Sequence, residues 1–230
     1  MTAFALSRVA WRPCFRIVPS RFPPVQLFER VGDPADWEAL AELELLTNPR
    51  LRDAIGEIAL VPPEDRIAGP GASPVMAAFT HLNPAGSRFS DGTFGVYYAA
   101  RDEQTAIRET VFHRERFLAD SSQPPQMLEM RAYLADVSGT FRDLRGHRDR
   151  LGYLDPASYA VSQPFGRQLR ERGENGIVYP SVRNPGGECV AVMRARTLTP
   201  ARQGRHYGYR WDGARVREVI ELRATGFHPG

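Results

Sequence analysis

Apolar and polar positions alternate along the chain in a way that predicts seven strands. Phe94 to Ala100 is aromatic and β-branched, which is typical of a buried strand. The dipeptide Asp212-Gly213 between two alternating runs is the strongest hairpin signal in the chain. Arg12 to Pro19 is expected to be a short strand, because the prolines at its ends cannot extend a ladder. The predicted strands are 12–19, 94–100, 127–137, 176–181, 189–196, 206–211 and 214–222.

Helices are predicted where a capping residue opens an apolar repeat of helical period. Asp102 precedes a run whose apolar positions would lie on one helix face. Asp33-Pro34, Asn48-Pro49 and Asp155-Pro156 each combine a capping residue with a proline that suits a first helical position. Gly173 is a natural end for the last of these helices. The predicted helices are 33–46, 48–60, 73–79, 103–118 and 155–173.

Strands and helices are intermixed without a strict βαβ repeat, which favours an α+β fold with a mixed β-sheet core. We expect one domain over residues 1–230. Residues 33–80 would form an extra N-terminal helical segment inserted into that domain, and residues 206–222 a C-terminal hairpin.

Composition narrows the class of protein. The chain of 230 residues is 42% hydrophobic and 10% aromatic, enough for a real core. It has no run of about 18 apolar residues, so we expect no membrane span. The first eight residues lack the apolar stretch of a secretory signal. Cys14 and Cys189 stand far apart, without zinc-like spacing, and we therefore expect a cytoplasmic protein.

The basic residues are all arginine. The net charge is only +3, and the 30 arginines are scattered among acids rather than gathered in a stripe. Direct nucleic-acid binding is therefore not expected. Arginine nevertheless supplies planar, bidentate donors wherever a phosphate or carboxylate must be bound.

Candidate chemistry concentrates in one segment. A polar loop carrying Arg88 leads into the aromatic strand with Tyr97 and Tyr98, whose side chains should point to opposite faces. The following helix carries Glu109 beside apolar positions. Arg88, a tyrosine and Glu109 could therefore meet in one crevice, where a carboxylate would need a partner.

Each candidate also has an ordinary structural interpretation. Glu109 could be an edge residue paired with Arg108, His113 or Arg116. Arg16 could be an outward-facing strand residue. Ser181 could cap a turn, since it lacks the surroundings of a serine nucleophile.

Several kinds of site are not indicated by any motif. The chain has neither a Walker loop nor a G-x-G-x-x-G fingerprint, so arginines and loop amides would have to bind any nucleotide. The five histidines show no metal-ligand spacing, and no metal is expected. Two rival functions stay open: a non-enzymatic nucleic-acid-binding module, and a glycosidase that would pair Glu109 with Asp91 or Asp102.

Three segments together resemble the RES-domain family, named for an arginine, a glutamate and a serine. They are Phe15 to Phe22, Gly86 to Glu109, and Gly176 to Cys189. The chain departs from the family pattern at Phe89 and Ser90, where many members have tryptophan and asparagine.

The resemblance implies a fold similar to ADP-ribosyltransferases and the toxin role in a bacterial toxin–antitoxin system. It implies an enzyme that consumes NAD, by transferring ADP-ribose to a cellular protein or by hydrolysing or phosphorolysing NAD without a protein acceptor. The expected partner is an antitoxin with a DNA-binding domain. The residues that match the family's functional positions are Arg16, Arg88, Tyr98, Glu109 and Ser181. Of these, Glu109, Arg16 and Ser181 would be catalytic, and Arg16, Arg88, Tyr98 and Ser181 would bind NAD.

Overall fold

Seven strands form one mixed sheet in the computed structural model, which describes residues 4–20, 56–146 and 151–223. Their order is β1-β2-β5-β4-β3-β6-β7, and neighbours are antiparallel except β3 and β4, which are parallel. The predicted α+β class with a mixed sheet is confirmed. The strands are β1 Leu6–Pro19, β2 Tyr97–Ala100, β3 Gln126–Asp143, β4 Gly176–Pro180, β5 Glu188–Val192, β6 Arg202–Trp211 and β7 Val216–Leu222.

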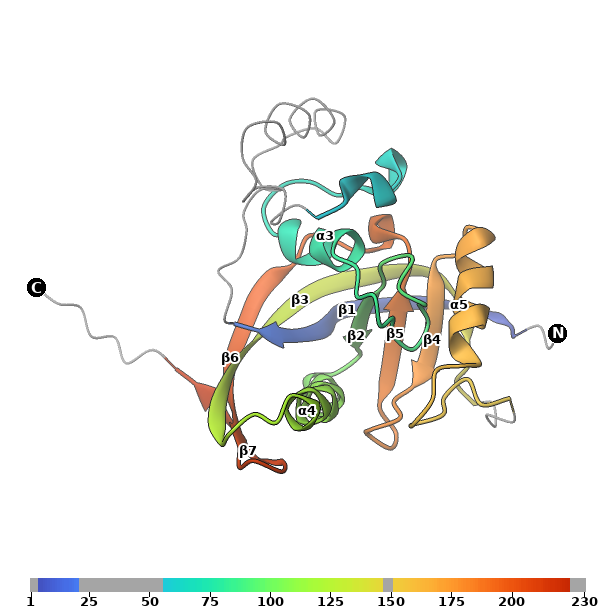
Figure 1. The fold of residues 1–230 in the computed structure, drawn as a ribbon. Helices are drawn as coiled ribbons and strands as arrows, with labels where there is room; N and C mark the ends of the chain where they lie inside the picture. The colour runs from blue at the N-terminus through green and yellow to red at the C-terminus, as the bar shows by residue number, and fades with distance from the viewer. Residues whose placement is uncertain (1–3, 21–55, 147–150, 224–230) are drawn as a thin grey trace, which may run out of the picture.

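The sheet curls back on itself because β1 pairs with β3 as well as with β2. The pairing of β1 with β3 runs from Leu6 opposite Arg142 to Pro19 opposite Met130. The pairing of β1 with β2 is confined to Phe15 opposite Ala100. The long strands β1 and β3 therefore cross the ends of the shorter strands β2, β5 and β4 (Figure 1).

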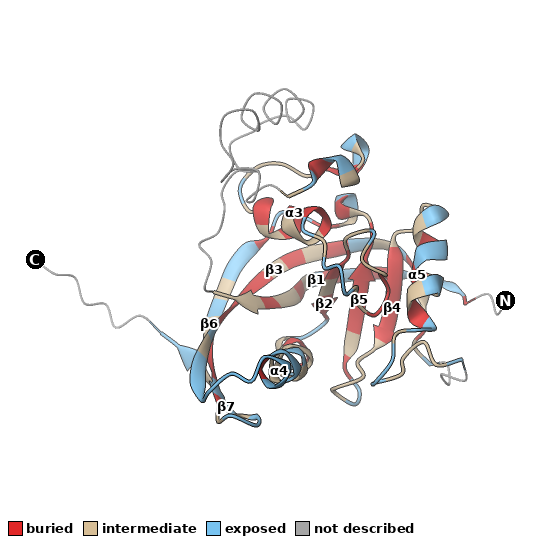
Figure 2. Ribbon diagram, viewed as in Figure 1, coloured by how far each residue is buried: buried red, intermediate tan, exposed pale blue. Residues whose placement is uncertain are grey.

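Helices cover the two faces of this curled sheet. Helix α3 (Ser73–Thr80) packs Met76 and Phe79 into one hydrophobic cluster. Helices α4 (Glu103–Asp120) and α5 (Ser162–Glu171) contribute Ala106 and Leu169 to a second cluster on the other face. Figure 1 shows α3 and α4 on opposite sides of the sheet, and Figure 2 shows buried residues concentrated on the strands between them. Burial of these apolar faces is the main stabilising term of the fold.

Strand β1 is longer than predicted. It begins at Leu6 and continues past Pro13, which was expected to limit it. The register with β3 shifts between Trp11 and Cys14, and this irregularity accommodates a residue that has no N–H for the ladder.

The predicted helix 155–173 is wrong in its first half. Helix α5 begins at Ser162, although it ends near Gly173 as expected. The Asp155 carboxylate instead accepts hydrogen bonds from the N–H groups of Ala157 and Ser158, at 2.7 and 3.0 Å. The carboxylate thus stabilises a local turn, and such turns compete with helix formation.

Strand β3 continues to Asp143, well beyond its predicted end at residue 137. The remaining boundaries differ by a few residues from those predicted. Helices α3 and α4 lie where expected. Strand β2 begins at Tyr97 rather than Phe94, and β5 ends at Val192 before the 3-10 turn Ala195–Thr197. Strands β6 and β7 pair around Asp212 and Gly213 as predicted.

The predicted N-terminal helices fall largely outside the described residues. Helix 33–46 and most of helix 48–60 belong to that part. The described remainder contains the 3-10 turns Ile58–Leu60 and Pro63–Asp65 before α3. Within the ranges that the structure describes, no helix has both the length and the apolar character needed to cross a membrane.

Candidate active site

Glu109 is presented by α4, whose start is determined by a side-chain cap. The Asp102 carboxylate accepts the N–H of Thr105 at 2.8 Å, which satisfies one of the free donors of the first turn. Thr105 and Ala106 are buried against the sheet. Glu109 lies one turn further along, half-buried at the edge of this contact.

The partner of Glu109 is Ser181, which follows β4. The Ser181 hydroxyl donates a hydrogen bond of 2.6 Å to Glu109 Oε1. The Ser181 hydroxyl oxygen in turn accepts the N–H groups of Arg183 and Asn184, at 3.2 and 2.9 Å. A hydroxyl has one hydrogen, and since its lone pairs are used by the two amides, that hydrogen points to the carboxylate.

The Ser181 hydroxyl therefore caps a turn, as its ordinary interpretation predicts, and also contacts the glutamate. Glu109 lies at the edge of the helix contact, as its ordinary interpretation predicts, but without the expected ion pair. Among the described residues Glu109 forms no ion pair, and Arg116 instead approaches Asp120 at 3.8 Å.

The turn after Ser181 is fastened to the first turn of α4. Asn184 Nδ2 donates to Thr105 Oγ1 at 2.8 Å. Gly187 lies so close to the Thr105 side chain that a Cβ there would be 2.4 Å from Oγ1. This contact needs glycine and holds the turn, and with it Ser181, close to the helix that carries Glu109.

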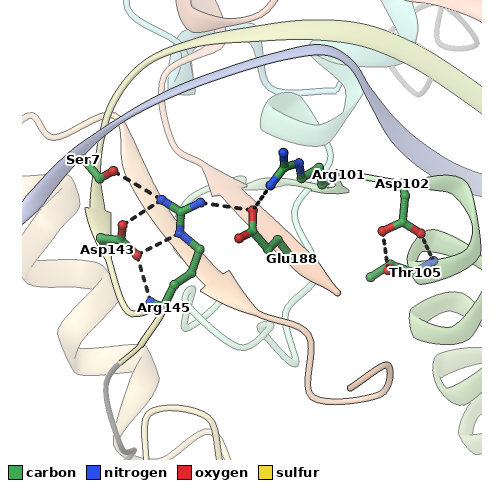
Figure 3. A network of polar contacts seen from close by, with 7 residues as sticks. All are labelled: Ser7, Arg101, Asp102, Thr105, Asp143, Arg145 and Glu188. Carbon is green, nitrogen blue, oxygen red and sulfur yellow. Dashed lines mark hydrogen bonds and ion pairs between the residues drawn. The ribbon is translucent and has the colours of Figure 1, made fainter. Parts of the chain in front are cut away.

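A network of charged groups ties the start of α4 to three strands. Arg145 donates to both oxygens of Asp143 and, at 3.0 Å, to Glu188 at the start of β5. Arg101, directly before the Asp102 cap, donates to the same Glu188 oxygen at 3.0 Å. Arg145 also reaches Ser7 of β1 (Figure 3). The network thus links β1, β3, β5 and the residue preceding α4.

Arg88 lies in a loop against the far side of this site. Its guanidinium donates to the carbonyl oxygens of Asp155, at 2.8 Å, and Tyr153, at 3.4 Å. It also lies over the Tyr159 ring, 4.9 Å from the centroid. Only 8% of the residue is exposed, so the predicted loop arginine is not simply solvated.

Tyr98 holds the loop that carries Arg88. Its hydroxyl accepts the N–H of Phe89 at 2.9 Å and shares a hydrogen bond of 2.8 Å with Ser87. Burial raises the pKa of Tyr98 to about 12, although both hydrogen bonds favour the ionised form. The side chain thus stays a neutral donor and acceptor at physiological pH.

Phe89 and Ser90, which depart from the family pattern, have structural roles here. Phe89 is fully buried and meets Tyr179 edge to face, with ring centroids 5.2 Å apart. The Ser90 hydroxyl donates to the Phe94 carbonyl at 2.6 Å. Both residues shape the Arg88 loop.

Arg16 lies apart from the other candidates. As expected, Tyr97 and Tyr98 pack on opposite faces of the sheet, and the Arg16 guanidinium lies over the Tyr97 ring at 4.8 Å from its centroid. It also donates to the Tyr98 carbonyl at 3.1 Å, and burial lowers its pKa. In the part of the chain that the structure describes, Arg16 makes no hydrogen bond or ion pair with Glu109 or Ser181, and its buried Nε has no partner. The structure therefore joins Glu109 to Ser181, joins Tyr98 to the Arg88 loop, and connects Arg16 to Tyr98 through its backbone. Burial raises the pKa of Tyr179, and the charges of Glu109 and Arg88 both act on it, which relates the two pairs electrostatically.

Arg183 and Tyr159 were missed by the sequence analysis. Arg183 lies on the Phe112 ring of α4, 3.3 Å from its centroid, and donates to the Pro156 carbonyl at 2.6 Å. Burial lowers the pKa of Arg183, whereas the charge of Glu109 raises it. Tyr159 stands in the stretch wrongly predicted as helix. The only sequence signal was the position of Arg183 two residues after Ser181.

An open groove of about 390 Å³ lies between α4 and β7. Apolar and charged side chains line it in equal number. Arg183 and Phe112 are among the lining residues, so a ligand in the groove can reach Arg183.

The carboxylates required by the glycosidase hypothesis are used elsewhere. Asp102 caps α4. Asp91 accepts hydrogen bonds from Thr93 and pairs with Arg167. Neither contacts Glu109. Among the described residues, no group of three or more histidine, cysteine or acidic side chains could bind a metal ion.

Comparison with known proteins places the chain in a family. The RES domain pattern matches residues 63–212, which include Arg88, Tyr98, Glu109 and Ser181 but not Arg16. Protein y4oC of Sinorhizobium fredii (strain NBRC 101917 / NGR234), described as uncharacterized, is 35% identical over 220 residues, covering 92% of this chain and 88% of the relative. A chain in the crystal structure of the M. tuberculosis MbcT-MbcA toxin-antitoxin complex is similar with a TM-score of 0.44 and 11% identity, over 94% of this chain and 86% of that chain. From the match to most of the chain and the identity to its relative, this protein belongs to the RES-domain family.

Proposed function

We propose that this protein cleaves NAD at the bond between nicotinamide and ribose. The observation that carries the proposal is the short hydrogen bond between Ser181 and Glu109, 2.6 Å long, in a site flanked by Arg88 and Arg183. Family membership supports the substrate, because NAD consumption is what the resemblance to RES-domain proteins implies. Arginines and loop amides are also the means of binding pyrophosphate when no glycine-rich nucleotide motif is present.

The chemistry requires a carboxylate near the ribose. When the bond between C1′ and the nicotinamide nitrogen breaks, its electron pair leaves with nicotinamide and the ribose acquires oxocarbenium character. The Glu109 carboxylate stabilises this charge and accepts hydrogen bonds from the ribose hydroxyls, an electrostatic effect worth a few kcal/mol for one well-placed group. An acceptor then adds to C1′ and loses its proton.

Ser181 orients the glutamate in this proposal. Because its oxygen is already bound by two amides, the hydroxyl fixes Glu109 Oε1 and leaves Oε2 to face the substrate. Ser181 could act by contact with nicotinamide or by orientation of Glu109, and its hydrogen bonds favour orientation.

Arg88 and Tyr98 contact the substrate in this proposal. Arg88 contacts the pyrophosphate, and the Tyr98 ring stacks on nicotinamide while its hydroxyl positions the Arg88 loop. Arg16 lies on the opposite side of β2 and supports Tyr98 through its hydrogen bond to the Tyr98 carbonyl.

The acceptor that we propose first is a cellular protein, which would make the enzyme a mono-ADP-ribosyltransferase. Water or phosphate as acceptor would make it an NAD glycohydrolase or phosphorylase. In either case the protein would act as the toxin of a bacterial toxin–antitoxin system, silenced by an antitoxin that carries a DNA-binding domain.

Replacing Glu109 by glutamine tests the reaction. The purified protein is incubated with NAD, and released nicotinamide is followed by chromatography. Glu109→Gln should abolish release, because the neutral amide cannot stabilise the ribosyl cation, and the unfolding midpoint should stay unchanged. Glu171→Gln, an exposed position on α5, is the matched control and should keep full activity.

Added phosphate, or cell lysate with labelled NAD, then identifies the acceptor. Label on protein indicates ADP-ribosyl transfer, and free ADP-ribose or its phosphate indicates the alternatives. Equal release by the parent and Glu109→Gln would contradict the role of Glu109. No release under any condition would overturn the proposal in favour of a nucleic-acid-binding module, for which steeply salt-dependent binding is the test.

A further inference from the structure

The backbone of one short segment accepts hydrogen bonds from the guanidinium groups of Arg88 and Arg183. We call residues 153–159 the strap. Arg88 donates to the Asp155 carbonyl at 2.8 Å, and Arg183 donates to the Pro156 carbonyl at 2.6 Å. Two arginines from distant parts of the chain thus donate hydrogen bonds to the carbonyl groups of consecutive residues in one loop segment.

The strap atoms that accept these two hydrogen bonds are neutral carbonyl oxygens. The Asp155 carboxylate accepts the N–H groups of Ala157 and Ser158, and these bonds, together with the charge of Arg88, lower its pKa. In the described part of the chain, neither Arg88 nor Arg183 forms an ion pair. The positive charge of Arg88 also lowers the pKa of Arg183, which places two like charges near each other. Neutral carbonyls are a weaker match for two guanidinium groups than an anion would be.

Arg183 is held in a fixed position relative to Glu109. Its guanidinium lies 3.3 Å from the centroid of the Phe112 ring, which is three residues beyond Glu109 on α4. Its backbone N–H donates to Ser181, the partner of Glu109. Three contacts therefore join this arginine to the helix, the serine turn and the strap. The groove between α4 and β7 leaves it accessible to a ligand.

We propose that Arg183 and Arg88 form a clamp for the pyrophosphate of the dinucleotide substrate, and that the strap carbonyls occupy this clamp when substrate is absent. This inference rests on the proposed function and adds a binding residue, Arg183, that the family motif does not assign. Pyrophosphate oxygens replace the carbonyls of Asp155 and Pro156 on the same two guanidinium groups. The exchange substitutes charge-assisted bidentate hydrogen bonds for single bonds to neutral oxygens. Nicotinamide ribose would then extend from the clamp toward Glu109, which Ser181 connects to Arg183.

Binding of inorganic pyrophosphate, measured by calorimetry, tests the clamp without any turnover. The parent should bind pyrophosphate, and Arg183→Gln should weaken binding about tenfold to a hundredfold, the effect of losing a hydrogen bond to a charged group. Arg183→Lys keeps the charge but loses the planar guanidinium group, so its affinity for pyrophosphate should lie between those of the parent and Arg183→Gln. Arg210→Gln removes an exposed arginine of β6 and is the matched control, expected to bind like the parent.

Kinetics with NAD separates binding from chemistry. Arg183→Gln should raise KM for NAD by a similar factor while kcat changes much less, because Glu109 and Ser181 remain in place. An equal loss of kcat at unchanged KM, with normal pyrophosphate binding, would overturn the clamp and make Arg183 a positioning residue for Glu109.

The strap is tested by hydrogen exchange of the peptide covering residues 153–159. Saturating pyrophosphate should speed its exchange, because the carbonyl anchors to Arg88 and Arg183 are released. Unchanged exchange at full occupancy would overturn the strap's part of the proposal.

The two proposals fail in different ways. Pyrophosphate binding that depends on Arg183 in a protein that never releases nicotinamide would reject the NAD reaction and keep the anion clamp. Nicotinamide release with the same KM in the parent and Arg183→Gln would reject the clamp and keep the reaction.

Discussion

The Ser181 hydroxyl has one direction left for its hydrogen. Two backbone amides occupy its oxygen, and Glu109 Oε1 lies 2.6 Å away. A carboxylate held in this way cannot rotate freely, so one oxygen is fixed and the other is available. At the scale of single residues, these contacts suit the role that we propose for this serine, which is orientation of Glu109 rather than nucleophilic attack.

Ser181→Ala should therefore reduce kcat for nicotinamide release by about tenfold to a hundredfold, the effect of losing a hydrogen bond to a charged group. The KM for NAD should change little, because the arginines remain. Nicotinamide release at varied NAD concentration gives both constants. Ser121→Ala, at the far end of α4, is the control and should leave both unchanged. A large rise in KM with normal kcat would instead indicate that Ser181 binds substrate directly.

At the scale of elements, the site is assembled by close contacts between helices and loops. Helix α5 lies against the Arg88 loop at Gly166, where a Cβ would be 2.0 Å from the Phe89 carbonyl oxygen. The serine turn touches α4 through Asn184 and Thr105. These contacts join the loop to α5 and the serine turn to α4, although these segments belong to different parts of the chain.

Gly166→Ala should destabilise the protein by about 1–3 kcal/mol, because the added methyl group forces α5 and the Arg88 loop apart. This exceeds the gain of about 1 kcal/mol that alanine brings to a helix interior. Thermal unfolding should show a lower midpoint, and KM for NAD should rise as Arg88 is displaced.

Gln168→Ala, exposed on the same helix, serves as its control and should preserve both values. A Gly166→Ala protein as stable and as active as the parent would contradict the prediction, because the Arg88 loop would then accommodate the methyl group without loss of stability.

At the scale of the whole molecule, buried tyrosines run through both hydrophobic clusters. Burial raises the pKa of Tyr98 and of Tyr209 to about 12, and raises the pKa of Tyr97, Tyr179 and Tyr207 as well. An unfolded tyrosine titrates near its ordinary pKa of about 10. Above that pH the unfolded chain therefore binds fewer protons than the folded one.

The free energy of unfolding should accordingly be insensitive to these groups below about pH 10 and fall as the pH rises from about 10 to 12. Thermal unfolding midpoints measured across this range check the fall, and tyrosinate absorbance should appear in step with unfolding. Tyrosine ionisation that precedes unfolding and follows ordinary pKa values would contradict the burial of these side chains.

Local patterns were enough to locate most of the helices and strands. Asp102 caps α4, Asp212-Gly213 forms the hairpin turn, and the alternation of Tyr97 and Tyr98 follows from the pleat of a strand. Such features depend on backbone groups only a few residues apart, so they can be read from neighbouring residues. The family motif likewise pointed to Arg88, Tyr98, Glu109 and Ser181 as candidates.

The partners of these residues depended on the tertiary structure. Glu109 bonds to Ser181, 72 residues away, rather than to a neighbour on its own helix. The stretch after Asp155 carries helix signals, yet its carbonyls bind Arg88 and Arg183 from distant loops. Contacts of this kind form only when the sheet brings remote segments together, and their energies outweigh the weak preferences that local sequence expresses.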